Sequence, residues 1–248
     1  ETFENVIDAQ LTRLKDGLFP KTTGGGGSEY DSIDAPLWFF WALQQLSAEL
    51  NDRKRIWNKY HVPMKKILDS YRSGTHYQIR MNEDGLISGG EEHLALTWMD
   101  SWINGKPVVD RTGMPVEVNA LWYNALCFAL KLAGAAGDVD FVNEWKGWSE
   151  KTAQSFVREF WSQERGYLAD CIHNGVKDWT VRPNMVIAAA MEYSPLDREM
   201  QKSVLSVVKK QLLTPEGLRS LTPESPFYEG LCEGTVMLRE RAVHQGTV

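Results

Sequence analysis

One long polar segment, residues 82–119, carries Asp100 and Glu117 together with the tryptophans Trp98 and Trp102. Asp100 comes two residues after Trp98, and Glu117 comes just before a strongly apolar stretch. A segment of this length without a helical repeat is uncommon inside a domain and is usually functional or disordered. Tryptophans at 98 and 102 argue against disorder. We therefore expect an active-site loop with an aromatic floor and two carboxylates.

Asp100 is the expected general acid. Burial against an aromatic ring raises the pKa of a carboxylic acid, and an acid that works near neutral pH needs that shift. A solvated loop aspartate or a helix N-cap would account for the same residue equally well. Glu117 is the second expected catalytic residue, although its place at the start of an apolar helix would also suit the helix dipole.

Other polar residues flank the expected helices. Asp34 more simply caps the helix that begins near Pro36, whereas Asp31 is suited to binding hydroxyl groups. Four more residues are candidates for the same substrate-binding site, although helix initiation or ordinary hydrogen bonding would also explain them: Arg182, Asn184, His244 and Gln245.

Composition excludes several classes of function. The chain carries a net charge of −6, which argues against binding to nucleic acid or to an anionic membrane. No apolar run reaches about 18 residues, so we expect no transmembrane helix. Three scattered cysteines without a CxxC spacing favour a reducing, cytoplasmic setting over a disulfide framework. We expect no metal and no cofactor, because no P-loop, GxSxG, HExxH or dinucleotide-binding motif is present.

The chain is expected to be nearly all α-helical, because helical periods recur and strand-like alternation is absent. Short Gly-containing turns follow several helix ends and precede long loops, as in Asp16-Gly17 and Asp84-Gly85. This repeat favours a toroid of helix pairs, with the apolar helices inside and the long loops at one mouth. The expected helices are 3–14, 37–50, 53–71 (with a kink or break at Pro63), 118–135, 139–161, 183–191 and 196–213, followed by loop over 214–248. The run Gly24–Ser28 is either a linker or a native flexible loop.

Together these motifs resemble the glucosidase domain of bacterial glycogen debranching enzymes, the amylo-α-1,6-glucosidase family. The matching stretches occur in the family's order and span nearly the whole chain: Glu29–Phe40, Leu96–Asp100, Pro115–Leu126, Arg182–Asn184, Leu213–Arg219 and His244–Val248.

The resemblance implies an (α/α)6 barrel and inverting hydrolysis of α-1,6-linked glucose at branch points of a glycogen-like α-glucan. Asp100 aligns with the family's general acid. Eukaryotic members carry a base Glu after a His-Gln-Gly motif, where this chain has Val248, so Glu117 is the substitute candidate. An inverting acid and base stand about 6.5–9.5 Å apart. The expected substrate-binding residues are Tyr30, Asp31, Asp34, Trp38, Trp98, Arg111, Asn119, Trp122, Tyr123, Arg182, Asn184, His244 and Gln245.

The resemblance also implies that residues 1–248 are part of a single barrel domain. Twelve helices are expected of a whole barrel, and the sequence predicts seven or eight here, with both ends missing relative to the family. Two other functions fit the same pattern. One is another inverting glycosidase on this barrel, such as a trehalase, and the other is a non-catalytic toroid that binds glycan or protein.

Overall fold

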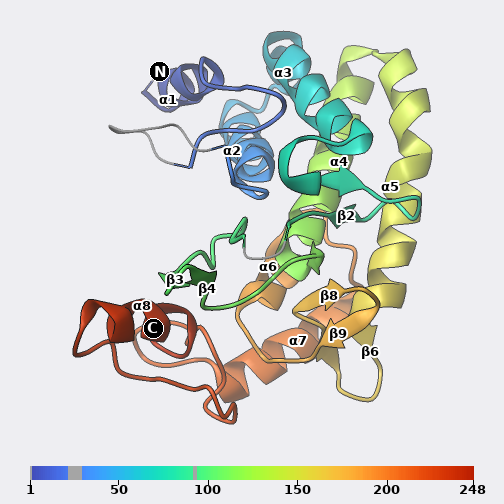
Figure 1. Cartoon of the computed structure of the whole chain (residues 1–248). Coiled ribbons are helices and arrows are strands. Elements are labelled where there is room, and N and C mark those ends of the chain that lie inside the picture. The colour runs from blue at the N-terminus through green and yellow to red at the C-terminus, as the bar shows by residue number, and fades with distance from the viewer. Residues whose placement is uncertain (1, 22–29, 92–93) are drawn as a thin grey trace.

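A computed structural model of the chain describes residues 2–21, 30–91 and 94–248, so the Gly24–Ser28 run lies outside the described residues. Eight α-helices dominate the described parts (Figure 1). Their bounds are α1 Thr2–Leu11, α2 Ala35–Leu50, α3 Arg53–Ser73, α4 Val116–Ala136, α5 Val139–Phe160, α6 Asn184–Ala190, α7 Arg198–Gln211 and α8 Val236–His244.

The helices follow one another as antiparallel pairs around α4. This helix packs against α2 and α6 on two sides and against α3 and α5 on the others, while α7 packs on α6 (Figure 1). Helices α2 and α4 are apolar nearly all round and buried, whereas α3, α5 and α7 each bury one apolar face. The expected all-α, toroid-like fold class is confirmed.

Long loops lead into the apolar helices and carry short two- or three-residue strands. These are β1 Arg80–Met81, β2 Ile87–Ser88, β3 Trp102–Ile103, β4 Lys106–Pro107, β5 Met114–Pro115, β6 Trp161–Ser162, β7 Tyr167–Leu168, β8 Cys171–His173 and β9 Val176–Asp178. A one-turn 3-10 helix, His76–Gln78, precedes β1. Strands this short show no measurable alternation, which is why none was expected from the sequence.

The loops of different helix pairs bond to one another, as the expected single mouth requires. β5 pairs antiparallel with β8, Ile33 N donates to Leu96 O at 2.9 Å, and Thr222 N donates to Val181 O at 3.1 Å. Gly113 allows the closest approach, because a Cβ there would lie 2.3 Å from the carbonyl oxygen of Ile172. The loops therefore form one continuous layer over one end of the helices.

Local signals explain most helix ends. Asp52, Asp138 and Asp197 accept hydrogen bonds from the first turns of α3, α5 and α7, as N-cap residues do. Asp34 occupies the N-cap position of α2, but its side chain does not cap, so the expected capping role is wrong. Ser32 Oγ instead accepts from Ala35 N at 3.1 Å. This leaves the Asp34 carboxyl group for other contacts.

Two expectations about helices need correction. Pro63 lies inside α3 without breaking it, since the helix runs unbroken from Arg53 to Ser73. Residues 214–248 are not all loop, because α8 begins at Val236, after the N-cap residue Thr235, whose hydroxyl accepts from Leu238 N. Helix α8 buries only two of its residues, Ala242 and His244, so its sequence shows no apolar stripe.

The apolar core has two parts. The larger joins α1 to α4 with the first half of α5, and the smaller lies between the second half of α5, α6 and α7. Trp122 of α4 stacks on Tyr71 of α3 with ring centroids 5.7 Å apart, and both side chains are fully buried. No helix in the described parts of the chain is long and apolar enough to cross a membrane.

Candidate active site

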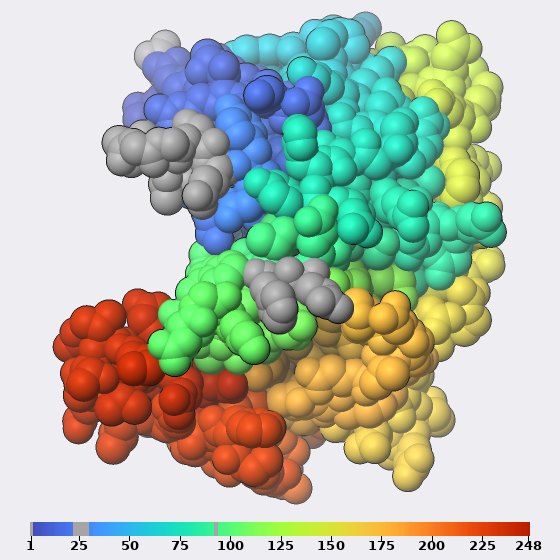
Figure 2. Space-filling model, in the orientation of Figure 1, coloured from blue at the N-terminus to red at the C-terminus, as the bar shows by residue number. Residues whose placement is uncertain are grey.

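A cavity of about 580 Å³ lies between α1, α2 and residues 97–100. We call it the acid pocket. Apolar side chains of α1 and α2 form most of its wall, and its polar members include Lys21, Asp34, Thr97 and Asp100. Figure 2 shows this side of the molecule hollowed between the N-terminal segment and the segment around residue 100. Enclosure by apolar groups with a few convergent polar ones is typical of small-molecule sites.

Asp100 lies at the edge of this pocket with its side chain 38% exposed. Its Oδ2 is 2.8 Å from Lys21 Nζ, and its amide N donates to His244 Nε2 at 3.1 Å. The His244 ring and the Lys21 ammonium lower the pKa of Asp100 to about 2. The expected upward shift is therefore wrong for this structure, because cationic and hydrogen-bonding neighbours outweigh desolvation.

Trp98 forms an aromatic wall beside Asp100. Its indole Nε1 donates to Asn184 Oδ1 at 2.8 Å, and its ring meets the His244 ring edge-on with centroids 5.4 Å apart. The side chain is held at two points yet is 40% exposed. A fixed, accessible indole face suits a flat apolar ligand surface, such as a face of a sugar ring.

Asp34 and Trp38 also line the acid pocket. Asp34 is buried, and its Oδ1 accepts a hydrogen bond from Ser32 Oγ at 2.7 Å. Burial raises the pKa of Asp34, which favours its protonated, hydrogen-bond-donating form. Two carboxyl groups in one pocket thus have opposite protonation tendencies.

Beneath the pocket lies a buried set of charges, Arg111, Glu117 and Asp170, which we call the arginine cluster. Both carboxylate oxygens of Glu117 accept from the Arg111 guanidinium, whose Nε donates to Asp170 Oδ2 at 3.0 Å. Burial alone would lower the pKa of Arg111, but the charges of Asp170 and Glu117 outweigh it and raise that pKa. The cluster is fully paired and joins the loop of Arg111, the first turn of α4 and the loop of Asp170.

A hydrogen-bonded chain links the arginine cluster to the pocket wall. Asp170 Oδ1 accepts from Asn184 Nδ2 at 2.7 Å, and Asn184 in turn holds the Trp98 indole. Arg111 Nη1 also donates to Thr97 Oγ1 at 3.4 Å. The orientation of Trp98 therefore depends on side chains that are themselves buried.

Glu117 does not line the acid pocket, and its side chain is fully buried. Its catalytic role stays a prediction. In this structure its task is to hold Arg111, with both carboxylate oxygens engaged.

Arg182 contacts both His244 and Gln245. Arg182 Nη1 donates to His244 O at 2.6 Å and Nη2 donates to Gln245 Oε1 at 3.0 Å. A third bond runs from Nη1 to Ser220 O at 3.2 Å. Arg182 thereby fixes the C-terminal segment that brings His244 to Asp100.

Five other expected binding residues lie outside the acid pocket's lining. Asn119 bonds the backbone of Ile87 at 2.7 and 3.0 Å, and Trp122 donates to Gly85 O at 3.0 Å, so both anchor the 82–90 loop. The remaining three are Tyr30, Asp31 and Tyr123. The Tyr30 hydroxyl donates to Arg13 O at 3.1 Å, Asp31 Oδ2 lies 3.8 Å from Lys21 Nζ, and Tyr123 is half-buried on α4.

Two residues of the site were missed from the sequence. Asp170 is an acid inside the apolar stretch Leu168–Cys171, a pattern that signals a buried, paired carboxylate. Lys21 follows Pro20 in an ordinary loop and carries no sequence signal of its pairing with Asp100. In the described parts of the chain, no group of three or more His, Cys, Asp or Glu residues is placed to hold a metal ion.

Two solved structures share this arrangement of helices. A GH78 family rhamnosidase of Bacillus sp. GL1 superposes with a TM-score of 0.62 and 16% identity, covering 87% of this chain and 21% of that chain. A rhamnosidase from Klebsiella oxytoca with rhamnose bound has a TM-score of 0.55 and 10% identity, covering 79% of this chain and 34% of that chain. At these identities the likeness shows the fold alone.

Sequence comparison identifies the family. The glycogen debranching enzyme of Saccharomyces cerevisiae is 23% identical over 274 residues, which cover 91% of this chain and 17% of that enzyme. The chain thus spans about a sixth of its relative's length. The family model described as amylo-alpha-1,6-glucosidase matches residues 1–248, from the first helix to the segment that holds His244 against Asp100. The chain belongs to the amylo-alpha-1,6-glucosidase family.

Proposed function

We propose that the protein carrying this chain hydrolyses single α-1,6-linked glucose residues at branch points of a glycogen-like α-glucan. The observation that supports this proposal best is the acid pocket, where Asp100, Trp98 and Asp34 line one cavity. The family and its relative's glycogen debranching activity support the choice of substrate. The absence of a strongly basic surface charge agrees with a neutral ligand.

Asp100 is the proposed general acid. The glucose ring enters the acid pocket and packs on Trp98, while the glycosidic oxygen reaches Asp100. Excluding water raises the pKa of a carboxylic acid, and displacing the Lys21 ammonium from its 2.8 Å contact raises it further. Asp100 then gives its proton to the oxygen that leaves with the main glucan chain.

Asp34 is the proposed hydrogen-bond donor to a glucose hydroxyl, because burial keeps its carboxyl group protonated more readily than a solvated one. An inverting reaction also needs a base that activates water on the opposite face of the sugar. Among the described residues, Asp34 is the only acidic residue besides Asp100 that lines the acid pocket. Glu117 is not given the role of base here, because both of its carboxylate oxygens accept hydrogen bonds from Arg111.

The test uses the whole protein and phosphorylase-limit dextrin. Asp100→Asn is expected to lower kcat for glucose release by about 100-fold or more, the usual contribution of a general acid. Asp140→Asn, the same change at an exposed position on α5, is the control. NMR of the first product identifies β-glucose if the reaction inverts. Unchanged kcat in Asp100→Asn, or release of glucose from trehalose but not from the dextrin, would contradict the proposal.

A further inference from the structure

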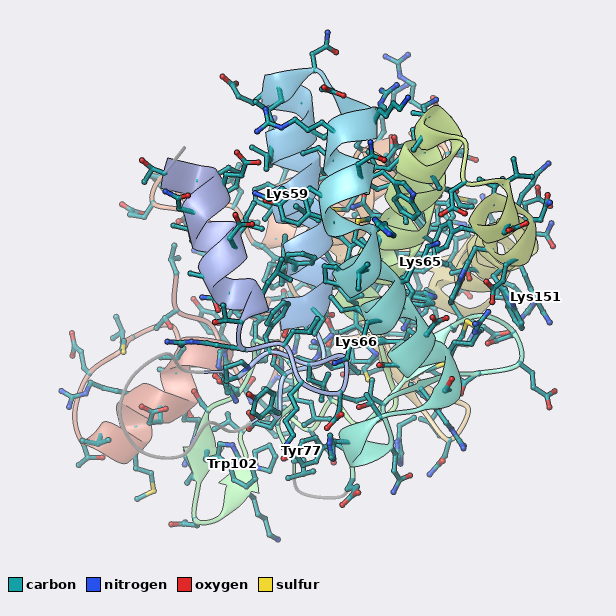
Figure 3. The ribbon with its side chains drawn as sticks, turned by 90° about the horizontal axis from the view of Figure 1, so that it is seen from above. Lys59, Lys65, Lys66, Tyr77, Trp102 and Lys151 are labelled. Carbon is teal, nitrogen blue, oxygen red and sulfur yellow. The ribbon has the colours of Figure 1, made fainter. Side chains whose placement is uncertain are left out.

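A second cavity, of about 430 Å³, lies between the β3–β4 hairpin, the segment Pro226–Glu229 and helix α8. We call it the hairpin cavity. None of the expected site residues except Gln245 lines it. Figure 1 shows β3 and β4 between α2 and α8, and Figure 3 labels Trp102 on this hairpin.

One wall of the hairpin cavity is aromatic and fixed. Tyr228 packs so closely on Gly246 that a Cβ there would lie 2.5 Å from the tyrosine ring, and Arg219 Nε donates to the Tyr228 hydroxyl at 3.2 Å. Glu229 N donates to Gln245 O at 2.6 Å, which ties this wall to the C-terminal segment. Phe227 also lines the cavity, and the residue is 71% exposed. Rigid aromatic faces are the surfaces on which sugar rings stack.

The polar groups of the cavity offer both donors and acceptors. Glu229 Oε1 accepts from Arg241 Nη1 at 3.0 Å, and both side chains stay partly exposed. Gln245 Oε1 is engaged by Arg182, while its Nε2 bonds no other described residue and so keeps two donors for a ligand. A carboxylate at this place repels phosphate, and a purely apolar ligand would leave the charged pair unsatisfied. A neutral polyhydroxylated chain satisfies both requirements.

The hairpin cavity lies directly beside the candidate acid. Asp100 lines the acid pocket, and Ile103, in the strand that follows it, lines the hairpin cavity. The C-terminal segment likewise contacts both sites. His244 accepts a hydrogen bond from the Asp100 amide, and the next residue, Gln245, lines the hairpin cavity. One layer of chain therefore separates the two cavities.

We propose that the hairpin cavity binds the main α-1,4-linked glucan chain from which the glucose in the acid pocket is removed. This inference rests on the proposed function. The oxygen that receives the proton of Asp100 leaves with the main chain, so that chain must run past Asp100 and away from the glucose. The hairpin cavity supplies stacking surface and hydrogen-bonding groups on that side.

The test compares two substrates in the whole protein: maltohexaose that carries one α-1,6-linked glucose, and isomaltose, which has no main chain. Phe227→Ala and Arg241→Gln are expected to raise KM for the branched maltohexaose about fivefold to tenfold relative to KM for isomaltose. Val176→Ala, another strongly exposed apolar side chain, and Arg158→Gln, another exposed arginine paired with a glutamate, are the controls. Equal changes for both substrates, or none, would overturn the inference.

Calorimetric binding of unbranched maltohexaose separates the two proposals. Weaker binding by Phe227→Ala supports the hairpin cavity even if the whole protein releases no glucose, in which case only the proposed function fails. Binding unaffected by both substitutions, in a protein that does release glucose, overturns the hairpin cavity alone. Each measurement is repeated with Glu229→Gln, which removes the negative charge and keeps the shape of the side chain.

Discussion

The arginine cluster and the acid pocket both pair carboxylates with a cation, yet they differ in access to water. Arg111, Glu117 and Asp170 are almost completely buried, and each charge is matched by direct hydrogen bonds. Lys21 and Asp100 form a single contact, with 26% and 38% of their side chains exposed. A fully enclosed pair cannot exchange partners without a large desolvation cost, whereas an exposed pair can. The residues of the arginine cluster therefore hold the site in place, whereas a ligand can engage Lys21 and Asp100.

The largest effect is expected from opening the arginine cluster. Arg111→Met leaves two buried carboxylates without their cation and should lower the free energy of unfolding by about 3–5 kcal/mol. Chemical denaturation measures the loss. Arg158→Met removes an exposed ion pair and should cost less than about 1 kcal/mol. Similar losses in the two variants would show that burial does not distinguish the pairs.

A smaller loss is expected at the link between the two regions. Asn184→Leu removes the partner of the Trp98 indole and one donor to Asp170, which should cost about 1–3 kcal/mol. The same change in a Trp98→Phe background should cost less, because the indole no longer needs a partner. Asn58→Leu, on the exposed face of α3, is the control. If the two substitutions lower the free energy of unfolding strictly additively, Trp98 is not coupled to the arginine cluster through Asn184.

The pH dependence of stability should distinguish Asp34 from Asp100. Because the pKa of Asp34 is raised in the folded state, its favourable contribution is present at acidic pH and is lost as pH rises through the folded pKa. Asp34→Asn has no carboxyl group at this position, so it does not lose this stability as pH rises. The free energy of unfolding of the variant minus that of the wild type should therefore increase with pH. A difference that is constant with pH would contradict the shift.

The smallest effect is expected at the pocket's ion pair. Lys21→Met should raise the pKa of Asp100 from about 2 toward its ordinary value, since the ammonium is lost while His244 remains. The lowered pKa of Asp100 contributes stability that is present above its unfolded pKa of about 3.9 and is lost as pH falls toward 2. At neutral pH the variant should lose under about 1 kcal/mol. Carboxyl NMR titration measures the pKa, and Lys131→Met is the control, in which the Asp100 titration should not move.

The helices were largely predictable because apolar periods and capping residues are local signals. Helix α4 needed only its long apolar stretch and Gly137. Helix α8 was not predictable, since it lies across the loop layer with little of its surface buried. Its N-terminal boundary can be recognised only from the hydrogen bond that the Thr235 hydroxyl accepts from Leu238 N.

The roles of the expected site residues stay predictions, and the structure places only some of them around one cavity. Family-like motifs pointed to Asp34, Trp38, Trp98 and Asp100, which do line one cavity. The pKa direction of Asp100 was wrong because it depends on Lys21, which lies far upstream in the chain. The pairing of Glu117 with Arg111 depends on how a non-helical loop folds back, and no sequence period records that.

The bonding between loops has a consequence for how this protein can vary. Three junctions join four loops from different helix pairs: Ile33 with Leu96, β5 with β8, and Thr222 with Val181. Inserted residues between these junctions would shift Asp100 against its neighbours. The tight turns at Asn104-Gly105 and Asn174-Gly175 lie beyond the paired strands, so added length is tolerated there. Related chains should differ in length at these tips while the junctions keep their spacing.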